Sequence, residues 1–93
     1  MARYELLVVL SPALAEDEVP EAVDRLKALI TERGGVEESL EVQGRRRLAY
    51  PIKKHRDGTL VLTRFDLPPQ RVHEVEASLR VDERVLRNLL VRI

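Results

Sequence analysis

Two kinds of hydrophobic periodicity alternate along this chain, and their order limits the folds that it can adopt. Apolar residues alternate at period two in some segments, which indicates strands, and recur every three or four residues in others, which indicates amphipathic helices. Each expected helix has a single apolar stripe, so each buries only one side. In chain order the segments are strand 3–10, helix 18–33, extended segment 36–52, strand 59–67, helix 69–80 and strand 85–93.

Punctuating residues support these boundaries. Asp17 is a suitable N-cap for the first helix, Pro20 fits its first turn, and Gly34-Gly35 follow its end. Gly44 indicates a bulge or bend within the long extended segment. The segment 55–58, which ends in Asp-Gly, predicts a hairpin turn because these residues tolerate the positive φ of tight turns.

The order β-α-β-β-α-β predicts a single α+β domain over residues 1–93, with the ferredoxin-like arrangement. Two one-sided helices cover one face of a four-stranded antiparallel sheet, with the first and third strands in its centre. The other face is left without helices and must be polar or meet a partner. The expected core contains Val8, Leu26, Ile30, either Leu60 or Val61, Val75 and Leu79.

Composition argues against several classes of function. The chain has no cysteine, which removes disulfides, thiol nucleophiles and thiolate metal sites. His55 and His73 lack the spacing of metal ligands, and no catalytic set of side chains is evident. No leader peptide is expected at the N-terminus, and the apolar run 6–10 is too short to cross a bilayer. We therefore expect a cytoplasmic protein that is not an enzyme, without cofactor, metal, membrane partner or small-molecule substrate.

Positive charge is concentrated in residues 44–54, which hold five basic residues and one aromatic in a chain of zero formal net charge. Such a cluster suits the phosphates and exposed bases of RNA, but a charged run is also typical of a solvated strand edge. Arg45, Arg46 and Arg47 would alternate in direction along a strand, so a flat partner would not touch all three. Tyr50 either stacks on a base or packs in the core, and packing is the commoner role.

Apolar residues occupy both faces of the first and last strands. Leu7 and Val9 should point away from the helices, and Leu89 and Val91 are expected beside them because the last strand lies next to the first. An apolar patch of this kind is either a partner site or an ordinary scatter of exposed aliphatics. We favour an interface with a partner protein at these four residues, because the doubling falls on adjacent strands.

Specific stretches of the chain resemble the sixth protein of the bacterial small ribosomal subunit. Residues 46–52, Arg-Arg-Leu-Ala-Tyr-Pro-Ile, carry most of the resemblance. Arg3-Tyr4-Glu5, Leu10-Ser11-Pro12, Lys53-Lys54 and Gly58 support it. The resemblance implies a structural ribosomal component that binds the central domain of 16S ribosomal RNA together with the eighteenth small-subunit protein, without catalysis.

Two further classes of function stay open from the residues alone. One is a ferredoxin-like protein-interaction module, a trimmed or redesigned scaffold that binds no RNA. The other, an enzyme or small-molecule binder, lacks convergent titratable groups. On the ribosomal interpretation, the residues expected to contact RNA are Arg3, Arg45, Arg46, Arg47, Lys53, Lys54, Arg87 and Arg92.

Overall fold

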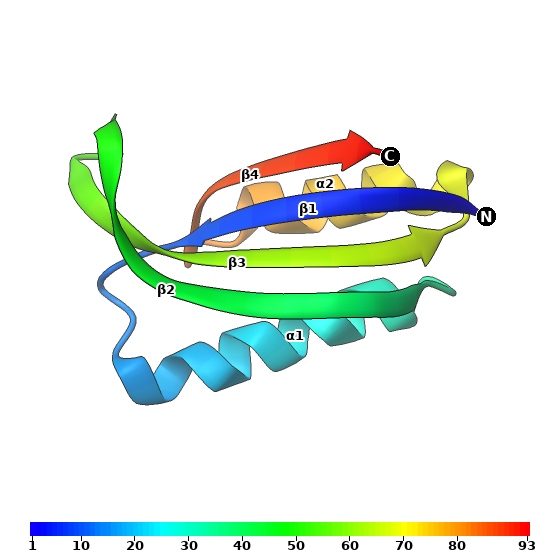
Figure 1. The fold of residues 1–93 in the computed structure, drawn as a ribbon, viewed down its shortest axis with the longest axis horizontal. Helices are drawn as coiled ribbons and strands as arrows, with labels where there is room; N and C mark the ends of the chain where they lie inside the picture. Colours follow the sequence, from blue (N-terminus) through cyan, green and yellow to red (C-terminus); the bar gives the residue numbers. More distant parts are fainter.

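The computed structural model describes all 93 residues and has the predicted order of strands and helices. Two short 3-10 helices, η1 (Glu16–Glu18) and η2 (Pro69–Arg71), lead into the two α-helices. The main elements are β1 (Ala2–Leu10), α1 (Val19–Thr31), β2 (Val36–Ile52), β3 (His55–Leu67), α2 (Val72–Val81) and β4 (Val85–Arg92) (Figure 1).

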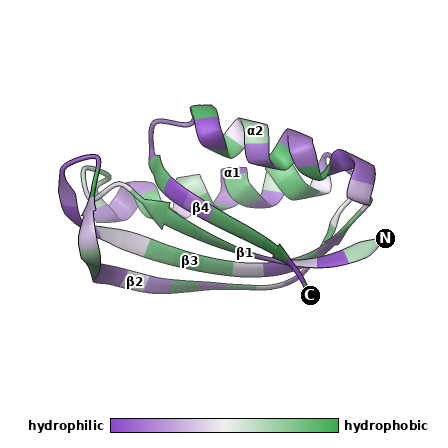
Figure 2. Ribbon diagram, turned by 90° about the horizontal axis from the view of Figure 1, so that it is seen from above, coloured by the Kyte–Doolittle hydropathy of each residue, from purple (hydrophilic) through white to green (hydrophobic).

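The four strands form one sheet in the order β2-β3-β1-β4, and every neighbouring pair is antiparallel. The first and third strands are therefore central, as the pattern predicts. Both helices lie on the same side of the sheet (Figure 2). This is the ferredoxin-like α+β fold expected from the sequence, and it leaves one sheet face, the open face, without helices.

The core lies between the helices and the sheet. Alternate residues of β1, from Tyr4 to Leu10, point into it and are buried. Val61 is fully buried while Leu60 is only partly buried, which decides between the two expected candidates. Packing of apolar stripes on an apolar sheet face is thus the main source of stability. The other expected members are all present in the core: Val8, Leu26, Ile30, Val75 and Leu79.

The start of the first helix differs from the prediction. Asp17 lies inside the 3-10 helix η1, so it is not the N-cap of α1, which begins at Val19. The Glu18 carboxylate instead accepts a hydrogen bond from the Ala15 backbone N–H at 2.8 Å. Acidic side chains in the first turns also suit the positive end of the helix dipole. The end agrees with expectation, since Gly34 follows the helix with φ of +78°.

The turn of the β2–β3 hairpin is not where Asp57-Gly58 predicted it. Lys53 and Lys54 make the turn with φ of 49° and 71°, and β3 already begins at His55. Gly58 is buried within β3, where an added Cβ would lie 2.6 Å from Val9 Cγ1. The glycine is needed for a close approach of two chain segments, which a sequence signal for turns cannot distinguish from a turn.

Gly44 bends β2 as expected. Its φ is +88°, and the pairing of β2 with β3 shifts register between Val42 and Gly44. Beyond this point the end of the hairpin leaves the line of the sheet (Figure 1). A bulge of this kind increases the local twist and bends the strand. The bend brings Tyr50 of β2 within hydrogen-bonding contact of Arg87 on β4, which lies at the opposite edge of the sheet.

Candidate nucleic-acid interface

The far end of the hairpin, residues 44–58, forms a projecting basic arm. It contains six basic residues and one acidic residue in a chain with sixteen of each. The remainder of the protein is therefore net negative. All six basic side chains are exposed, and the arm consists of Arg45, Arg46, Arg47, Lys53, Lys54 and Arg56 with the single carboxylate of Asp57.

Contacts within the arm divide its basic residues into two groups. Arg45 is held at the base, where its Nη2 donates to the Pro12 carbonyl at 3.0 Å and its Nη1 lies 3.9 Å from Asp57 Oδ2. Arg46 Nη1 donates to the Arg45 carbonyl at 3.3 Å. Arg47, Arg56 and both turn lysines make no side-chain hydrogen bond or ion pair. These charges remain available to a polyanion. The arginines and Asp57 also line a shallow hollow that has no apolar residue.

An apolar hollow lies on the open face between the arm and the sheet. Tyr50 and Arg87 stand beside it, with Arg87 Nη1 donating to the Tyr50 hydroxyl. Tyr50 is 57% exposed, so the interpretation that placed it in the core was wrong. The bend at Gly44 carries it away from the helices and onto the open face. The hollow is lined by Leu7, Val9, Leu48, Ala49, Tyr50, Ile52, Leu60, Arg87 and Leu89.

The four residues expected to meet a partner protein lie on this open face. Leu7 pairs directly with Leu89 across the β1–β4 ladder, and Val91 pairs with Glu5. Leu89 and Val91 are 52% and 42% exposed, whereas Val9 is only 6% exposed. A partner would therefore touch mainly the β4 residues. Sequence reasoning missed Leu48, Ile52 and Leu60, although the alternation in residues 59–67 indicated the face on which Leu60 lies.

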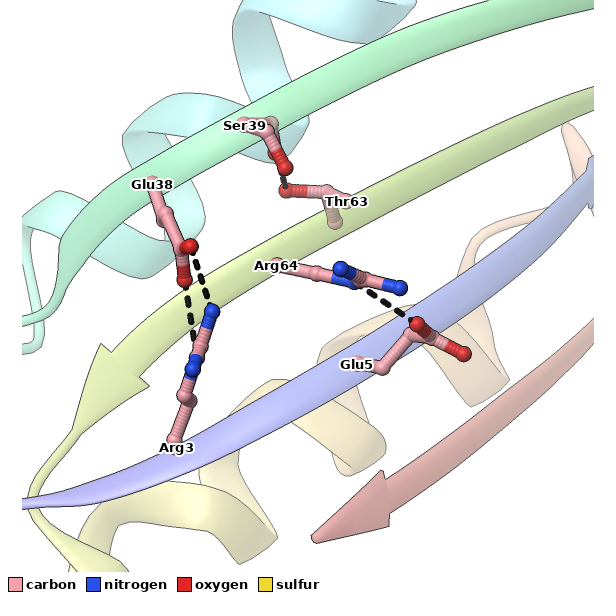
Figure 3. A network of polar contacts seen from close by, with 6 residues as sticks. All are labelled: Arg3, Glu5, Glu38, Ser39, Thr63 and Arg64. Carbon is pink, nitrogen blue, oxygen red and sulfur yellow. Dashed lines mark hydrogen bonds and ion pairs between the residues drawn. The ribbon is translucent and has the colours of Figure 1, made fainter. Parts of the chain in front are cut away.

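The opposite end of the open face is polar and internally neutralised (Figure 3). Arg3 forks onto the Glu38 carboxylate, with its Nε 2.9 Å from Oε2. Arg64 Nε donates to Glu5 Oε2 at 2.8 Å. On the other, helix-covered side of the sheet, the hydroxyl of the buried Thr63 donates to the Ser39 carbonyl at 2.9 Å. Arg3 therefore belongs to an ion-pair cluster near the N-terminus, which lies at the other end of the molecule from the arm (Figure 1).

The structure thus gathers only part of the predicted RNA-contact set. Arg45, Arg46, Arg47, Lys53 and Lys54 share the arm, and Arg87 adjoins it through Tyr50. Arg92 pairs with Tyr4, whose side chain is in the core, so its position in the ladder is on the helix-covered face.

Arg56 was missed because the sequence placed it in a turn. In the structure it lies in β3, beside the basic residues of β2.

Perturbed titratable groups lie elsewhere in the protein. Hydrogen bonding from Arg84 lowers the pKa of Asp82 just after α2. Hydrogen bonding from Arg71 similarly lowers the pKa of Glu74 within α2. Both are ion pairs of the helix layer. No group of three or more His, Asp or Glu side chains is arranged to hold a metal ion, and neither helix has the length and apolarity needed to cross a membrane.

Comparison with known proteins identifies the family. The family model described as ribosomal protein S6 matches residues 3–92. The chain belongs to the ribosomal protein S6 family. It is 42% identical to the small ribosomal subunit protein bS6 of Caldanaerobacter subterraneus over 99% of this chain and 97% of that protein. It is 39% identical to bS6 of Campylobacter lari, covering 99% and 74% of the two chains.

A solved structure supports the same assignment. The crystal structure of 30S ribosomal protein S6 from Thermotoga maritima superposes with a TM-score of 0.95 at 31% identity, covering 99% of this S6-family chain and 87% of that one. The resemblance seen in residues 46–52 is therefore confirmed. The chain is a structural protein of the small ribosomal subunit rather than an enzyme, and its place is the cytoplasmic ribosome.

Proposed function

We propose that this S6-family protein binds the central domain of 16S ribosomal RNA jointly with the eighteenth small-subunit protein. The basic arm contacts RNA phosphates, and the apolar part of the open face receives the partner protein. Residues assigned to RNA contact are Arg46, Arg47, Lys53, Lys54 and Arg56, with Arg45 and Arg87 at the border of the two surfaces.

One observation carries this proposal: a basic arm with four unpaired cations adjoins an apolar hollow on the face that has no helices. Arginine forks onto phosphate oxygens, and lysine adds a point charge. The exposed Leu89 and Val91 extend the hollow along β4 and offer apolar area to a protein surface. A partner seated there would lie against the base of the arm, so the two proteins would present one surface to the RNA.

Arg3 and Arg92 take a different place in the proposal. Arg3 is already paired with Glu38, and breaking that pair would offset part of any gain from a phosphate contact. Arg92 occupies a position of the helix-covered face near the same end. Both residues lie outside the proposed joint surface.

The RNA surface is tested with Arg46→Gln combined with Arg47→Gln. The partner and a central-domain RNA fragment are titrated at several salt concentrations. We expect the joint complex to bind the RNA more weakly, because phosphate contacts are lost. Each lost contact should also flatten the slope of log affinity against log salt by about 0.7–0.9. Lys27→Gln with Arg80→Gln removes the same charge from exposed helix positions and is the matched control. If the arm variant and the control variant weaken RNA binding equally, the loss reflects only the change in net charge and not a contact made by the arm.

The partner surface is tested separately with Leu89→Lys. Leu89 is half exposed, so the unfolding free energy should change by no more than about 0.5 kcal/mol. Assembly with the partner protein in the absence of RNA should be lost, because a buried unpaired ammonium is costly. Val81→Lys, on the exposed side of α2, is the control and should assemble normally. Normal assembly of Leu89→Lys would remove this face from the partner interface, and failure of the wild-type complex to bind the RNA fragment would leave an interaction module without an RNA role.

A further inference from the structure

The turn at the tip of the basic arm has an unfavourable backbone conformation. Lys53 and Lys54 are the only residues other than glycine with positive φ in the whole chain. Elsewhere the protein fills such positions with Gly34 and Gly44. For an L-residue, left-handed backbone places Cβ too close to the following carbonyl oxygen. Two adjacent lysines therefore occupy positions at which residues that tolerate positive φ would make the folded protein more stable.

Hairpin geometry defines the residues that this turn would favour. Ile52 pairs with His55, so only the two lysines connect the strands. Two-residue loops with positive φ at both positions favour Asn-Gly. Neither lysine recovers the cost within the protein, because both side chains are exposed and make no hydrogen bond or ion pair. Strain without local compensation points to a use outside the folded domain.

We infer that the strained turn is a phosphate-gripping tip, at which the protein gives up folding stability to place two ammonium groups at the outermost point of the arm. This inference rests on the proposed RNA function and adds a specific claim to it. The nearest carboxylate in the arm, Asp57, is occupied by Arg45, so it does not neutralise the tip. Lysine suits a projecting tip because its charge needs no fixed fork geometry at the phosphate.

Two double variants separate strain from charge. Lys53→Asn with Lys54→Gly relieves the backbone and removes both charges, while Lys53→Gln with Lys54→Gln removes the charges and keeps the strain. Urea unfolding of the protein and RNA titration of its complex with the partner are measured for each. The Asn-Gly variant should raise the folding equilibrium constant by about threefold or more. The Gln-Gln variant should leave that constant within about twofold of the wild type.

Both variants should weaken RNA binding and flatten the salt dependence by about 1.4–1.8 in the log–log slope, corresponding to two phosphate contacts. An Asn-Gly variant that is no more stable than the wild type would show that the turn is unstrained and overturn the inference. Unchanged affinity in the Gln-Gln variant would overturn it as well. Loss of assembly with the partner protein in the absence of RNA would assign the tip to a protein contact and reject the phosphate role.

The same titrations separate this inference from the proposed function. If the Arg46 and Arg47 substitutions weaken RNA binding but the Lys53 and Lys54 substitutions do not, the proposed RNA function stands and the phosphate-gripping tip is rejected. Failure of the wild-type joint complex to bind the RNA would reject both. The Lys27 and Arg80 control, which changes the charge equally, should retain full affinity.

Discussion

Replacing Gly58 with alanine tests whether this glycine serves a close approach or a turn. A Cβ at this position would lie 2.6 Å from Val9 Cγ1 and 3.0 Å from the Leu10 carbonyl oxygen. The second neighbour is backbone, which cannot move without disturbing β1. Forcing an extra methyl group into such a packed site costs about 1–3 kcal/mol. For a domain of this size each kcal/mol lowers Tm by roughly 4–8 °C.

Thermal and urea unfolding of four variants give the answer: Gly58→Ala, Gly58→Asn, Val9→Ala and the combination of Gly58→Ala with Val9→Ala. Gly58→Ala should be destabilised by the amount above, and Gly58→Asn by more, since its side chain is larger. A turn glycine would behave differently, because asparagine tolerates left-handed backbone. Combining Gly58→Ala with Val9→Ala removes one of the clashing atoms. The double variant should therefore lose less unfolding free energy than the sum of the losses in the two single variants. A stable Gly58→Asn variant, or strictly additive losses, would refute the close-approach explanation.

Two other predictions concern the core and the helix layer. Ile30 is fully buried, so Ile30→Ala should lower the unfolding free energy by about 2–5 kcal/mol in urea titrations; a loss below about 0.5 kcal/mol would contradict its place in the core. Arg84 lowers the pKa of Asp82 in the folded protein, so this carboxylate stabilises the fold above its ordinary pKa of 3.8 and loses that contribution as pH falls further. Asp82→Asn should therefore be less stable than the wild type at pH 7 and converge with it in acid, whereas Glu83→Gln, at an exposed neighbour, should track the wild type throughout.

Periodicity predicted the fold because each element buries its apolar side locally. The alternate residues of β1 from Tyr4 to Leu10 and the α1 residues Leu26 and Ile30 show this plainly, since all are buried in one core. The order of the elements, with right-handed crossovers, also predicted the central place of β1. Such patterns depend on neighbours two to four positions away, so they can be recognised without long-range information.

The hairpin turn could not be predicted in the same way. Asp57-Gly58 is a favourable turn pair, but Val9 and Leu10 approach Gly58 so closely that the glycine is required within the strand. That approach joins segments far apart in sequence. The two lysines that do form the turn give no local signal for it. The sequence therefore predicted the turn at residues 55–58, whereas it lies at Lys53 and Lys54.

The candidate site was predicted in composition but not in arrangement. The basic residues of 45–47 and 53–54 lie on one arm, whereas the sequence showed only that they are clustered along the chain. Pairing of Arg3 with Glu38 spans 35 positions in the sequence, and no periodicity reveals it. The contact of Tyr50 with Arg87 depends on the bend at Gly44 and on the sheet order. Only the folded structure shows which charges remain unpaired.

Zero net charge does not prevent the arm from attracting RNA. The Debye length at physiological ionic strength is about 8 Å, whereas the protein measures 36 by 25 by 21 Å along its principal axes. Charges on opposite sides of the molecule are therefore largely screened from each other. The acidic residues that balance the arm include five in the segment 16–24, where α1 begins. Figure 1 shows this segment at the same end of the long axis as the hairpin but below the sheet, whereas the hairpin tip turns upward, away from it. An approaching phosphate backbone would sense the local excess of positive charge at the tip. The acidic helix layer would repel it, which favours one orientation of the protein on the RNA.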